Sequence, residues 1–334
     1  MAFSTIYSPA FLEHRPRDYH PENPERLMRA VESLKRAGLW ESVIEPEPIL
    51  EKELLRVHSA KYVNLVKSLS GKFAYIDLDT YVSPGTWEAA LKAFGAARKA
   101  VELALKEKGL YLALVRPPGH HAGKSGRAFS APTLGFCIFN NAAYAAMVAE
   151  EKAGRVLVID FDAHHGNGTQ EILWDDPNAV HIDLHERGIY PGSGYEDEVG
   201  GKGAEGTKIN LPMPHYSTED DYIHAWDEVV LPITHQFKPR PIVVSAGFDG
   251  FLGENLTTLR LSEAFFAHAG ATLSSYSLAV IFEGGYSVGL DKGLPAFIKG
   301  YLSGKAPSVE VSPSREAVLV VEMVRKIQGE WWEL

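Results

Sequence analysis

Five short runs of apolar, largely β-branched residues most narrow the folds that this 334-residue chain can adopt. They lie at residues 111–115, 155–161, 179–184, 241–247 and 278–284. Their residues are hydrophobic almost without interruption, a pattern typical of strands buried on both faces of a sheet. Stretches with helical spacing lie between runs of this kind, at residues 86–109, 140–154 and 222–237. This alternation predicts βαβ units, and therefore an open, mostly parallel sheet with helices on both faces.

No break in composition divides the chain, so we expect a single domain over residues 1–334. The glycine-rich, acidic segment 191–207 predicts a long loop, and segment 303–314 predicts a connector. A closing helix should follow that connector, with Trp331 and Trp332 as packing residues near its end. Near the start, Asn23 can cap a helix whose first residue is a proline, after a loop of some length.

Composition and charge narrow the classes of function. The net charge is −10, which disfavours general binding to nucleic acid. The chain has no apolar stretch near the roughly 20 residues needed to span a bilayer, and its start does not follow the pattern of a signal peptide. Cys137 is the only cysteine, so a disulfide within the chain is excluded and a reducing compartment is the simplest location. We therefore expect a cytoplasmic protein without a nucleic-acid or membrane partner.

Polar side chains follow four of the apolar runs at the point where each run ends. The four segments are RPPGHH, DFDAHHGNG, FDG and EGGY. In open α/β sheets the ligand site lies beyond the carboxyl ends of the strands. The sequence therefore predicts that these histidines, aspartates and a tyrosine meet at one edge of the sheet.

The residues at this predicted edge suit a catalytic metal. Asp162 and His164 are two positions apart, so both side chains leave the same face of an extended segment, and Asp249 can supply a third ligand. Two carboxylates and one imidazole with an open position predict a zinc site, for which iron(II) is an alternative. Asp160 lies two positions before Asp162, so its side chain should leave the same face of the strand. It can orient a histidine or hold a second cation. Taken alone, each aspartate also fits a purely structural role, Asp162 as a helix cap and Asp249 as the first residue of a turn.

The remaining residues suit hydrolysis of a carbonyl compound. His120 and His121, presented by a stiff proline–glycine turn, can act as general base and general acid on a metal-activated water. The Tyr286 hydroxyl, in a glycine-rich turn, can donate to a developing oxyanion. The chain has no P-loop, and no dinucleotide fingerprint directly follows one of the apolar runs. Cys137 is expected to be a packed core thiol. Metal-assisted hydrolysis is the reaction that this combination predicts.

The chain resembles the histone deacetylase family, within the wider arginase–deacetylase fold. The matching segments occur in the same order as in the family and extend from about residue 14 to 290. They are HPENPERL, VHSAKYV, RPPGHHAG, GFCIFNNAAYAA, VLVIDFDAHHGNGTQEI, YPGSG, SAGFDG and EGGY.

The resemblance assigns roles to the residues of the predicted edge. It implies zinc bound by Asp162, His164 and Asp249. It also implies that His121 is the general base and acid, that His120 paired with Asp160 tunes the electrostatics, and that Tyr286 binds the carbonyl oxygen. The family also carries potassium or sodium ions. The residues implied beside the inner monovalent cation are Asp160, Asp162, His164, Asp183 and Leu184.

The resemblance further implies a channel that grips an acetylated aliphatic chain. Phe136 and Tyr190 match its aromatic walls, and Gly135 matches a glycine whose carbonyl accepts from the substrate amide. Asp79 resembles the aspartate at the rim that fixes the substrate, and Leu256 resembles a residue at the mouth. Arg26 resembles an arginine near the exit for acetate.

Three positions depart from patterns in the family. Asn167, placed beside His121, stands where class I enzymes have an aspartate, which indicates the class II side of the family. Asp183 stands where the inner cation site often has a serine. Leu256 stands where polyamine deacetylases of class II have a glutamate. This difference weakens the prediction of a polyamine substrate but does not exclude it.

The sequence thus predicts a metal-dependent deacetylase acting on an acetylated amine, either acetyl-lysine or an acetylpolyamine. One alternative is a protein that binds acylated ligands without catalysis. Another is an arginase-like ureohydrolase, although such enzymes hold two manganese ions and need a second aspartate where this chain has Gly166. The sequence leaves the physiological substrate and the oligomeric state open, and a homo-oligomer is compatible with it.

Overall fold

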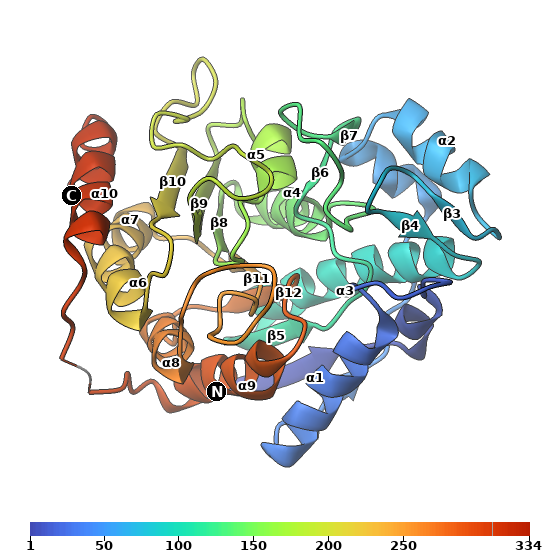
Figure 1. The fold of residues 1–334 in the computed structure, drawn as a ribbon, viewed down its shortest axis with the longest axis horizontal. Helices are drawn as coiled ribbons and strands as arrows, with labels where there is room; N and C mark the ends of the chain where they lie inside the picture. Colours follow the sequence, from blue (N-terminus) through green and yellow to red (C-terminus); the bar gives the residue numbers. More distant parts are fainter. Residues whose placement is uncertain (309) are drawn as a thin grey trace.

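A computed structural model describes residues 1–308 and 310–334 of the chain. Its centre is an eight-stranded sheet in which every pair of neighbouring strands runs parallel (Figure 1). From one edge to the other, its strands are β10 (Lys208–Met213), β9 (Ala179–Glu186), β8 (Val156–Asp160), β11 (Ile242–Ala246), β12 (Leu278–Phe282), β5 (Gly109–Ala113), β1 (Ala2–Ile6) and β2 (Val43–Ile44). The predicted parallel sheet is confirmed.

The five strands expected from the apolar runs are all present, and each is buried along its whole length. The apolar runs do not predict β1, β2 and β10. These strands lie toward the edges of the sheet and are less uniformly apolar: β10 contains Lys208, Asn210 and Pro212. An edge strand tolerates a proline because one side of its backbone has no strand to pair with. Two small hairpins, β3–β4 (Ala74–Tyr75, Tyr81–Val82) and β6–β7 (Ala122–Gly123, Gly126–Arg127), lie outside the main sheet.

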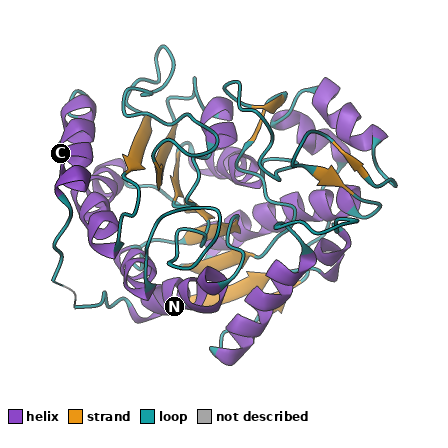
Figure 2. Ribbon diagram, viewed as in Figure 1, coloured by secondary structure: helices purple, strands orange, loops and turns teal. Residues whose placement is uncertain are grey.

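Helices cover both faces of the sheet, as Figure 2 shows. They are α1 (Pro24–Arg36), α2 (Ala60–Ser68), α3 (Thr86–Lys106), α4 (Asn141–Ala153), α5 (Asn167–Ile172), α6 (Glu219–Ala225), α7 (Leu231–Phe237), α8 (Glu263–Thr272), α9 (Val288–Ser303) and α10 (Arg315–Gln328), with 3₁₀ turns at Pro9–Glu13 and Glu51–Arg56. Helices α3 and α4 pack on the central strands, whereas α8 packs along α9 and against α6. Among the described residues, no helix is long and apolar enough to cross a membrane.

The helix expected over residues 222–237 is interrupted. A π-helical turn at Trp226–Val230 separates α6 from α7, and Pro232 stands near the start of α7. Proline has no N–H to continue the α-helical ladder, and its ring displaces the carbonyl of the preceding turn. A widened turn accommodates this change without ending the helical path.

Expectations near both ends of the chain are largely confirmed. The Asn23 side chain accepts a hydrogen bond from the Glu25 N–H at 2.9 Å and caps α1. The closing helix α10 follows the connector, of which residue 309 lies outside the described residues. Trp332 donates to the carbonyl of Gly206 at 2.7 Å, whereas Trp331 remains 41% exposed, so only one of the two tryptophans packs as expected.

The strand order places a change of chain direction at the centre of the sheet. After β8 the chain continues to β9 and β10 on one side, whereas β11 and β12 lie on the other side. Ser245 of β11 pairs with Asp160 of β8, so the two strands end at nearly the same level. Crevices of this kind, outside the carboxyl ends of parallel strands, are where α/β proteins bind ligands.

Candidate active site

The predicted metal ligands meet at this crevice. Asp162 and His164 follow β8, and Asp249 follows β11. The His164 Nδ1 atom lies 3.2 Å from Asp162 Oδ1 and 3.0 Å from Asp249 Oδ2. Both carboxylates are buried, and the three side chains offer ligand atoms that lie within 4.8 Å of one another. Two buried carboxylates and an imidazole at this spacing fit a divalent metal ion.

Backbone N–H groups orient the two carboxylates. Asp162 Oδ2 accepts from the Gly284 N–H at 2.8 Å, and Asp249 Oδ1 accepts from the Ala163 N–H at 3.0 Å. A Cβ atom at position 284 would lie 2.3 Å from Asp162 Oδ2, so only glycine permits this approach. These bonds leave Asp162 Oδ1 and Asp249 Oδ2 facing His164.

The two adjacent histidines have opposite electrostatic surroundings, and His120 lies among carboxylates. Its Nδ1 is 3.0 Å from Asp160 Oδ2, as the sequence predicted, and its Nε2 is 3.8 Å from Asp162 Oδ1. Although burial acts in the opposite direction, the Asp162 and Asp160 carboxylates raise the pKa of His120 well above its ordinary value. Both carboxylates therefore favour the imidazolium form of His120.

His121 is held neutral. Burial, together with the neighbouring His120 and His164, lowers the pKa of His121 well below its ordinary value. Its Nδ1 lies 2.8 Å from Asn167 Oδ1, while the Asn167 amide nitrogen donates to the Ala128 carbonyl at 3.2 Å. Because that second bond fixes which way the amide points, Asn167 presents an acceptor and His121 carries its proton on Nδ1. The Nε2 of His121 is thus free to act as a base.

Tyr286 lies in the loop after β12, and Arg26 of α1 lies directly behind it. The Arg26 Nε donates to the Gly285 carbonyl at 2.7 Å, and its guanidinium carbon is 4.4 Å from the centre of the Tyr286 ring. Arg26 is only 2% exposed. Arg26, which resembles an arginine near the exit for acetate, does not line the cavity and lies behind the tyrosine.

A cavity of about 240 Å³ opens above these residues. Its lining contains His121, His164 and Tyr286 together with five of the six predicted channel residues. The lining residues are Asp79, His121, Gly135, Phe136, His164, Tyr190, Leu256 and Tyr286. The Tyr190 ring stands edge-on to His121, with 4.8 Å between ring centres. Gly135 has a φ of +51°, and a Cβ there would lie 2.6 Å from the His121 ring, so the wall requires glycine at this position.

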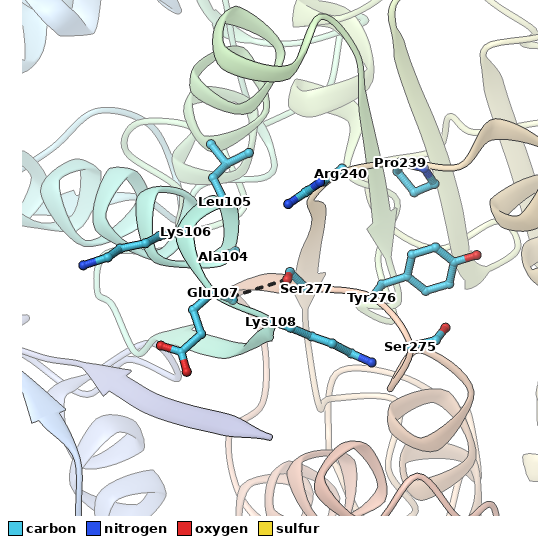
Figure 3. A pocket seen from close by; sticks show the side chains of 10 residues that line it. All are labelled: Ala104, Leu105, Lys106, Glu107, Lys108, Pro239, Arg240, Ser275, Tyr276 and Ser277. Carbon is cyan, nitrogen blue, oxygen red and sulfur yellow. Dashed lines mark hydrogen bonds between the residues drawn. The ribbon is translucent and has the colours of Figure 1, made fainter.

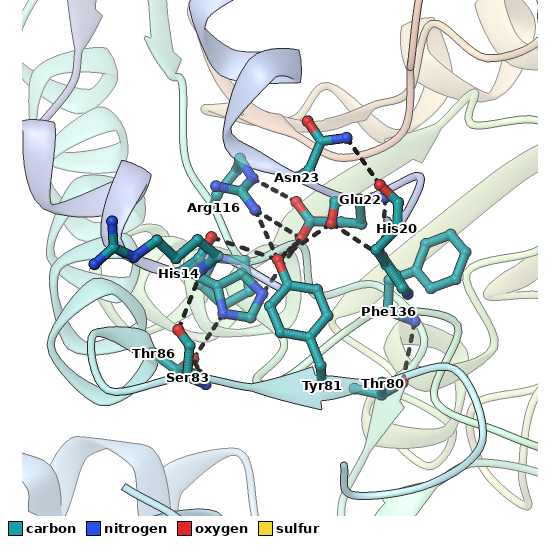
Figure 4. A network of polar contacts seen from close by, with 12 residues as sticks. His14, His20, Glu22, Asn23, Thr80, Tyr81, Ser83, Thr86, Arg116 and Phe136 are labelled. Carbon is teal, nitrogen blue, oxygen red and sulfur yellow. Dashed lines mark hydrogen bonds and ion pairs between the residues drawn. The ribbon is translucent and has the colours of Figure 1, made fainter. Parts of the chain in front are cut away.

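A buried polar network, drawn in Figure 4, supports the Phe136 wall. The Phe136 N–H donates to Thr80 Oγ1 at 3.2 Å, and the His20 ring packs edge-on against the Phe136 ring at 4.8 Å. His20 in turn contacts the backbone carbonyl of Asp79 through its Nε2 at 2.9 Å. The loop between β3 and β4, which carries the predicted rim aspartate, is thereby joined to the channel wall.

At the centre of this network lies a buried ion pair that the sequence reading did not single out. Both Glu22 and Arg116 are fully buried, and the Arg116 Nη2 donates to Glu22 Oε2 at 2.8 Å. Arg26 contacts the same carboxylate at 3.1 Å. The residues occur in the matching segments HPENPERL and RPPGHHAG, but nothing in their spacing indicates that they pair.

Glu283 was also missed. Its Oε2 accepts from the Gly119 N–H at 2.8 Å and so fixes the turn that presents the two histidines. Burial raises the pKa of Glu283 to about 7. Cys137 lies nearby and is buried, as predicted for a core thiol, and burial raises its pKa well above the ordinary value.

A second group of possible cation ligands lies behind the first. Asp160, His181 and Asp183 are fully buried, with ligand atoms within 4.8 Å of one another. Among the described residues, neither ring nitrogen of His181 has a hydrogen-bond partner. Asp183 accepts from the Gly166 N–H at 2.8 Å, and Leu184 follows it in β9. The structure therefore brings Asp183 to Asp160, as the sequence predicted.

Known proteins resemble this chain over nearly its whole length. The histone deacetylase domain matches residues 20–300. An uncharacterised protein of Methanocaldococcus jannaschii is 48% identical over 334 residues, covering 98% of this chain and 97% of that protein. A probable deacetylase of Archaeoglobus fulgidus is 32% identical and covers 100% of this chain and 99% of that protein. The crystal structure of the HDA15 HD domain is similar with a TM-score of 0.91 at 34% identity, covering 99% of this chain and 95% of that one. The chain belongs to the histone deacetylase family.

Proposed function

We propose that the protein is a metal-dependent amide hydrolase that removes acetyl groups from acetylated amines. Membership in the histone deacetylase family supports a deacetylase-type hydrolase activity. One observation carries the mechanism: His121, Tyr286 and His164 line the same cavity, and His164 lies beside the other two candidate metal ligands, Asp162 and Asp249. Together these groups supply a base, an oxyanion donor and ligands for a metal that activates water, which is a combination suited to amide hydrolysis.

Zn²⁺ is the proposed ion, with Fe²⁺ as an alternative for a ligand set that contains two carboxylates. Asp162, His164 and Asp249 would hold it. When bound, such an ion activates a water molecule and polarises the substrate carbonyl. The protein side chains perform the remaining steps.

His121 moves the protons. Its free Nε2 takes a proton from the attacking water, since Asn167 fixes the other proton on Nδ1. The imidazolium then gives a proton to the leaving amine, which completes cleavage of the C–N bond. His120, whose Nδ1 contacts Asp160, stabilises negative charge that develops nearby when it is protonated.

Tyr286 donates its hydroxyl proton in a hydrogen bond to the carbonyl oxygen. Burial raises the pKa of Tyr286 well above its ordinary value, so the phenol remains protonated and able to donate. One well-placed donor of this kind contributes about 3 kcal/mol of transition-state stabilisation.

The channel favours an acetylated amine on an aliphatic chain. Phe136 and Tyr190 offer aromatic walls, and Gly135 offers a backbone carbonyl for the substrate amide. Asp79 at the mouth supplies a carboxylate that suits either peptide N–H groups or a cationic polyamine. Acetyl-lysine and acetylpolyamine thus remain the two proposed substrate classes.

We also propose a monovalent cation, K⁺ or Na⁺, beside Asp160 and Asp183. Asp160, Asp162, Asp183 and Asp249 are buried within one region, and burial of uncompensated carboxylates is costly. A further cation would reduce that cost, with His164 and Leu184 as the other proposed neighbours. A cytoplasmic location and the absence of a nucleic-acid partner remain predictions from composition.

A side-by-side assay tests the proposal. The zinc-loaded protein is incubated with acetyl-lysine peptides and with N-acetylputrescine, and the released acetate is measured. We expect acetate from at least one class, loss of activity with a chelator, and recovery with Zn²⁺ or Fe²⁺. Absence of acetate from both classes under both metals would contradict the proposal.

A further inference from the structure

We propose that Glu254 is a positioning residue that holds Tyr286 in its productive place. The inference rests on the proposed function, since it concerns the tyrosine of that mechanism. Glu254 lies two positions before Leu256, in the loop that forms part of the channel mouth.

Glu254 binds the backbone of the tyrosine loop directly. Its Oε2 accepts from the Tyr286 N–H at 3.1 Å, and its Oε1 accepts from the Ser287 N–H at 2.9 Å and the Gly289 N–H at 2.8 Å. The residue is only 7% exposed. Charge-assisted bonds to backbone N–H groups are among the stronger hydrogen bonds in proteins. A single carboxylate therefore fixes the tyrosine and the first turn of α9 together.

Arg26 holds the same loop from its other side. Its guanidinium donates to the carbonyls of Glu283 and Gly285, while Glu254 takes the N–H groups that follow. The peptide units on both sides of Tyr286 are thus bound by buried charged groups. Because a backbone fixed on both sides leaves only side-chain torsions free, the phenol can reach few positions.

The loop that carries Glu254 is itself anchored farther along. Glu186, at the end of β9, accepts from Thr257 Oγ1 at 2.6 Å and from the Thr258 N–H at 2.8 Å. Leu256 therefore lies between two anchored points, one of which also holds Tyr286. This connection fixes the spacing between the channel mouth and the oxyanion donor.

The pattern of acceptors predicts a specific consequence for Glu254→Gln. The Gln side chain can place its oxygen where Oε1 now serves Ser287 and Gly289. Its amide nitrogen then faces the Tyr286 N–H, so two donors oppose each other. The substitution thus keeps the size of the side chain and the anchoring of α9, while it removes the bond to the tyrosine.

Asp221 offers a matched control. It is also a buried acid, 4% exposed, that accepts from two backbone N–H groups, those of Thr218 at 3.0 Å and Ser314 at 2.6 Å. Those bonds lie at the starts of α6 and α10, and Asp221 does not line the channel. Asp221→Asn therefore tests what the loss of a buried backbone acceptor does to the protein in general.

A double-mutant cycle with Tyr286→Phe tests the inference in the zinc-loaded full chain. Acetate release is measured from an acetyl-lysine peptide or from N-acetylputrescine, whichever the wild type hydrolyses faster. We expect Glu254→Gln to lower kcat by about 10- to 100-fold with little change in KM, since small misplacements of a catalytic group have effects of this size. In the Tyr286→Phe background the same change should cost less than about threefold, because the hydroxyl it positions is gone.

Two results would overturn the inference: equal losses in both backgrounds, or no loss in the wild-type background. Asp221→Asn should retain kcat, and a similar loss in that variant would mark the effect as general destabilisation. Glu254→Asp keeps the charge but shortens the side chain, and we expect it to retain more activity than Glu254→Gln.

Hydrogen exchange at residues 284–289 gives a readout that does not depend on turnover. We expect faster exchange of the Tyr286 amide in Glu254→Gln, with unchanged exchange there in Asp221→Asn. If the wild type hydrolyses no acetylated amine, the proposed function fails, and this measurement still decides whether Glu254 anchors the loop. Unchanged protection of the Tyr286 amide would overturn the anchoring itself.

Discussion

The two ends of the central sheet carry cavities of nearly equal size and different chemistry. The cavity at the carboxyl ends measures about 240 Å³, and one at the amino ends, drawn in Figure 3, measures about 260 Å³. The amino-end cavity lies between the end of α3, Pro239–Arg240 and residues 275–277. Its charged lining residues, Lys106, Glu107, Lys108 and Arg240, are exposed, and Lys108 and Arg240 extend from separate segments.

Burial and pairing, rather than volume, separate the two cavities. At the carboxyl ends, His121 faces Asn167, and two buried carboxylates face His164. Groups in such surroundings have shifted pKa values, which are frequent at functional sites. In the amino-end cavity, the charged side chains are exposed to solvent, where water already stabilises them. Of the two cavities, the one at the carboxyl ends therefore fits the proposed function.

The largest effect should come from removing a metal ligand at the carboxyl end. Asp162→Asn replaces a charged ligand by a neutral amide, and we expect loss of bound metal and a decrease in turnover of at least about 1,000-fold. Elemental analysis and acetate release check the two expectations together. Retention of one metal ion per chain with full turnover would remove Asp162 from the site.

Tyr286→Phe should have the next largest effect. The change deletes one hydroxyl and keeps the ring over Arg26, so we expect kcat to decrease by about 100-fold or more while metal content is unchanged. A protein that merely binds acylated ligands would keep its affinity and have no turnover to lose. Steady-state kinetics and a binding titration with the uncleaved substrate distinguish these outcomes.

Asn167→Asp should move the pH dependence rather than abolish activity. A carboxylate beside Nδ1 stabilises the imidazolium form of His121 and raises its pKa. Because the base must be neutral to accept a proton, the acid limb of kcat/KM should move to higher pH, by about one unit. The limb should stay at its wild-type position in Tyr286→Phe. An acid limb that does not move in Asn167→Asp would exclude His121 as the titrating base.

Lys208 lies at the amino end of the sheet and has a shifted pKa. It is fully buried at the start of β10, where its ammonium donates to the Ala179 carbonyl at 2.9 Å and to Thr207 Oγ1 at 2.7 Å. Burial lowers the pKa of Lys208 to about 7. Between pH 7 and the ordinary lysine pKa near 10.4, the unfolded chain binds the extra proton, so this residue makes stability increase as pH increases.

The corresponding measurement compares the wild type with Lys208→Met. We expect the difference in unfolding free energy, wild type minus variant, to increase by up to about 1.4 kcal/mol for each pH unit between pH 7 and 10.4. Denaturant titrations from pH 7 to 10 measure the difference. A difference that does not change with pH would mean that Lys208 keeps its ordinary pKa in the folded protein.

The sequence predicted the sheet and the cluster at its carboxyl edge because strong local signals carried both. Uninterrupted apolar runs mark central strands, and polar residues directly after them mark their carboxyl ends. Edge strands such as β10 lack that signal, since Lys208 and Asn210 are buried only through contacts made in the folded chain. For the same reason the sequence could not place Arg26 behind Tyr286, or pair Glu254 with that loop: the partners are 260 and 32 positions apart.

The smallest effect should come from the amino-end cavity itself. The double variant Lys108→Ala/Arg240→Ala removes two solvated charges from this cavity. The hydrogen bond that Ser277 Oγ donates to the Glu107 carbonyl there, at 3.4 Å, involves neither side chain. Exposed charges of this kind contribute little to stability. We therefore expect acetate release within about twofold of the wild type and a free energy of unfolding within about 0.5 kcal/mol. A larger loss of turnover would mean that changes at the amino-end cavity affect the site at the carboxyl ends. The difference in burial between the two cavities would then not be enough to identify the functional one.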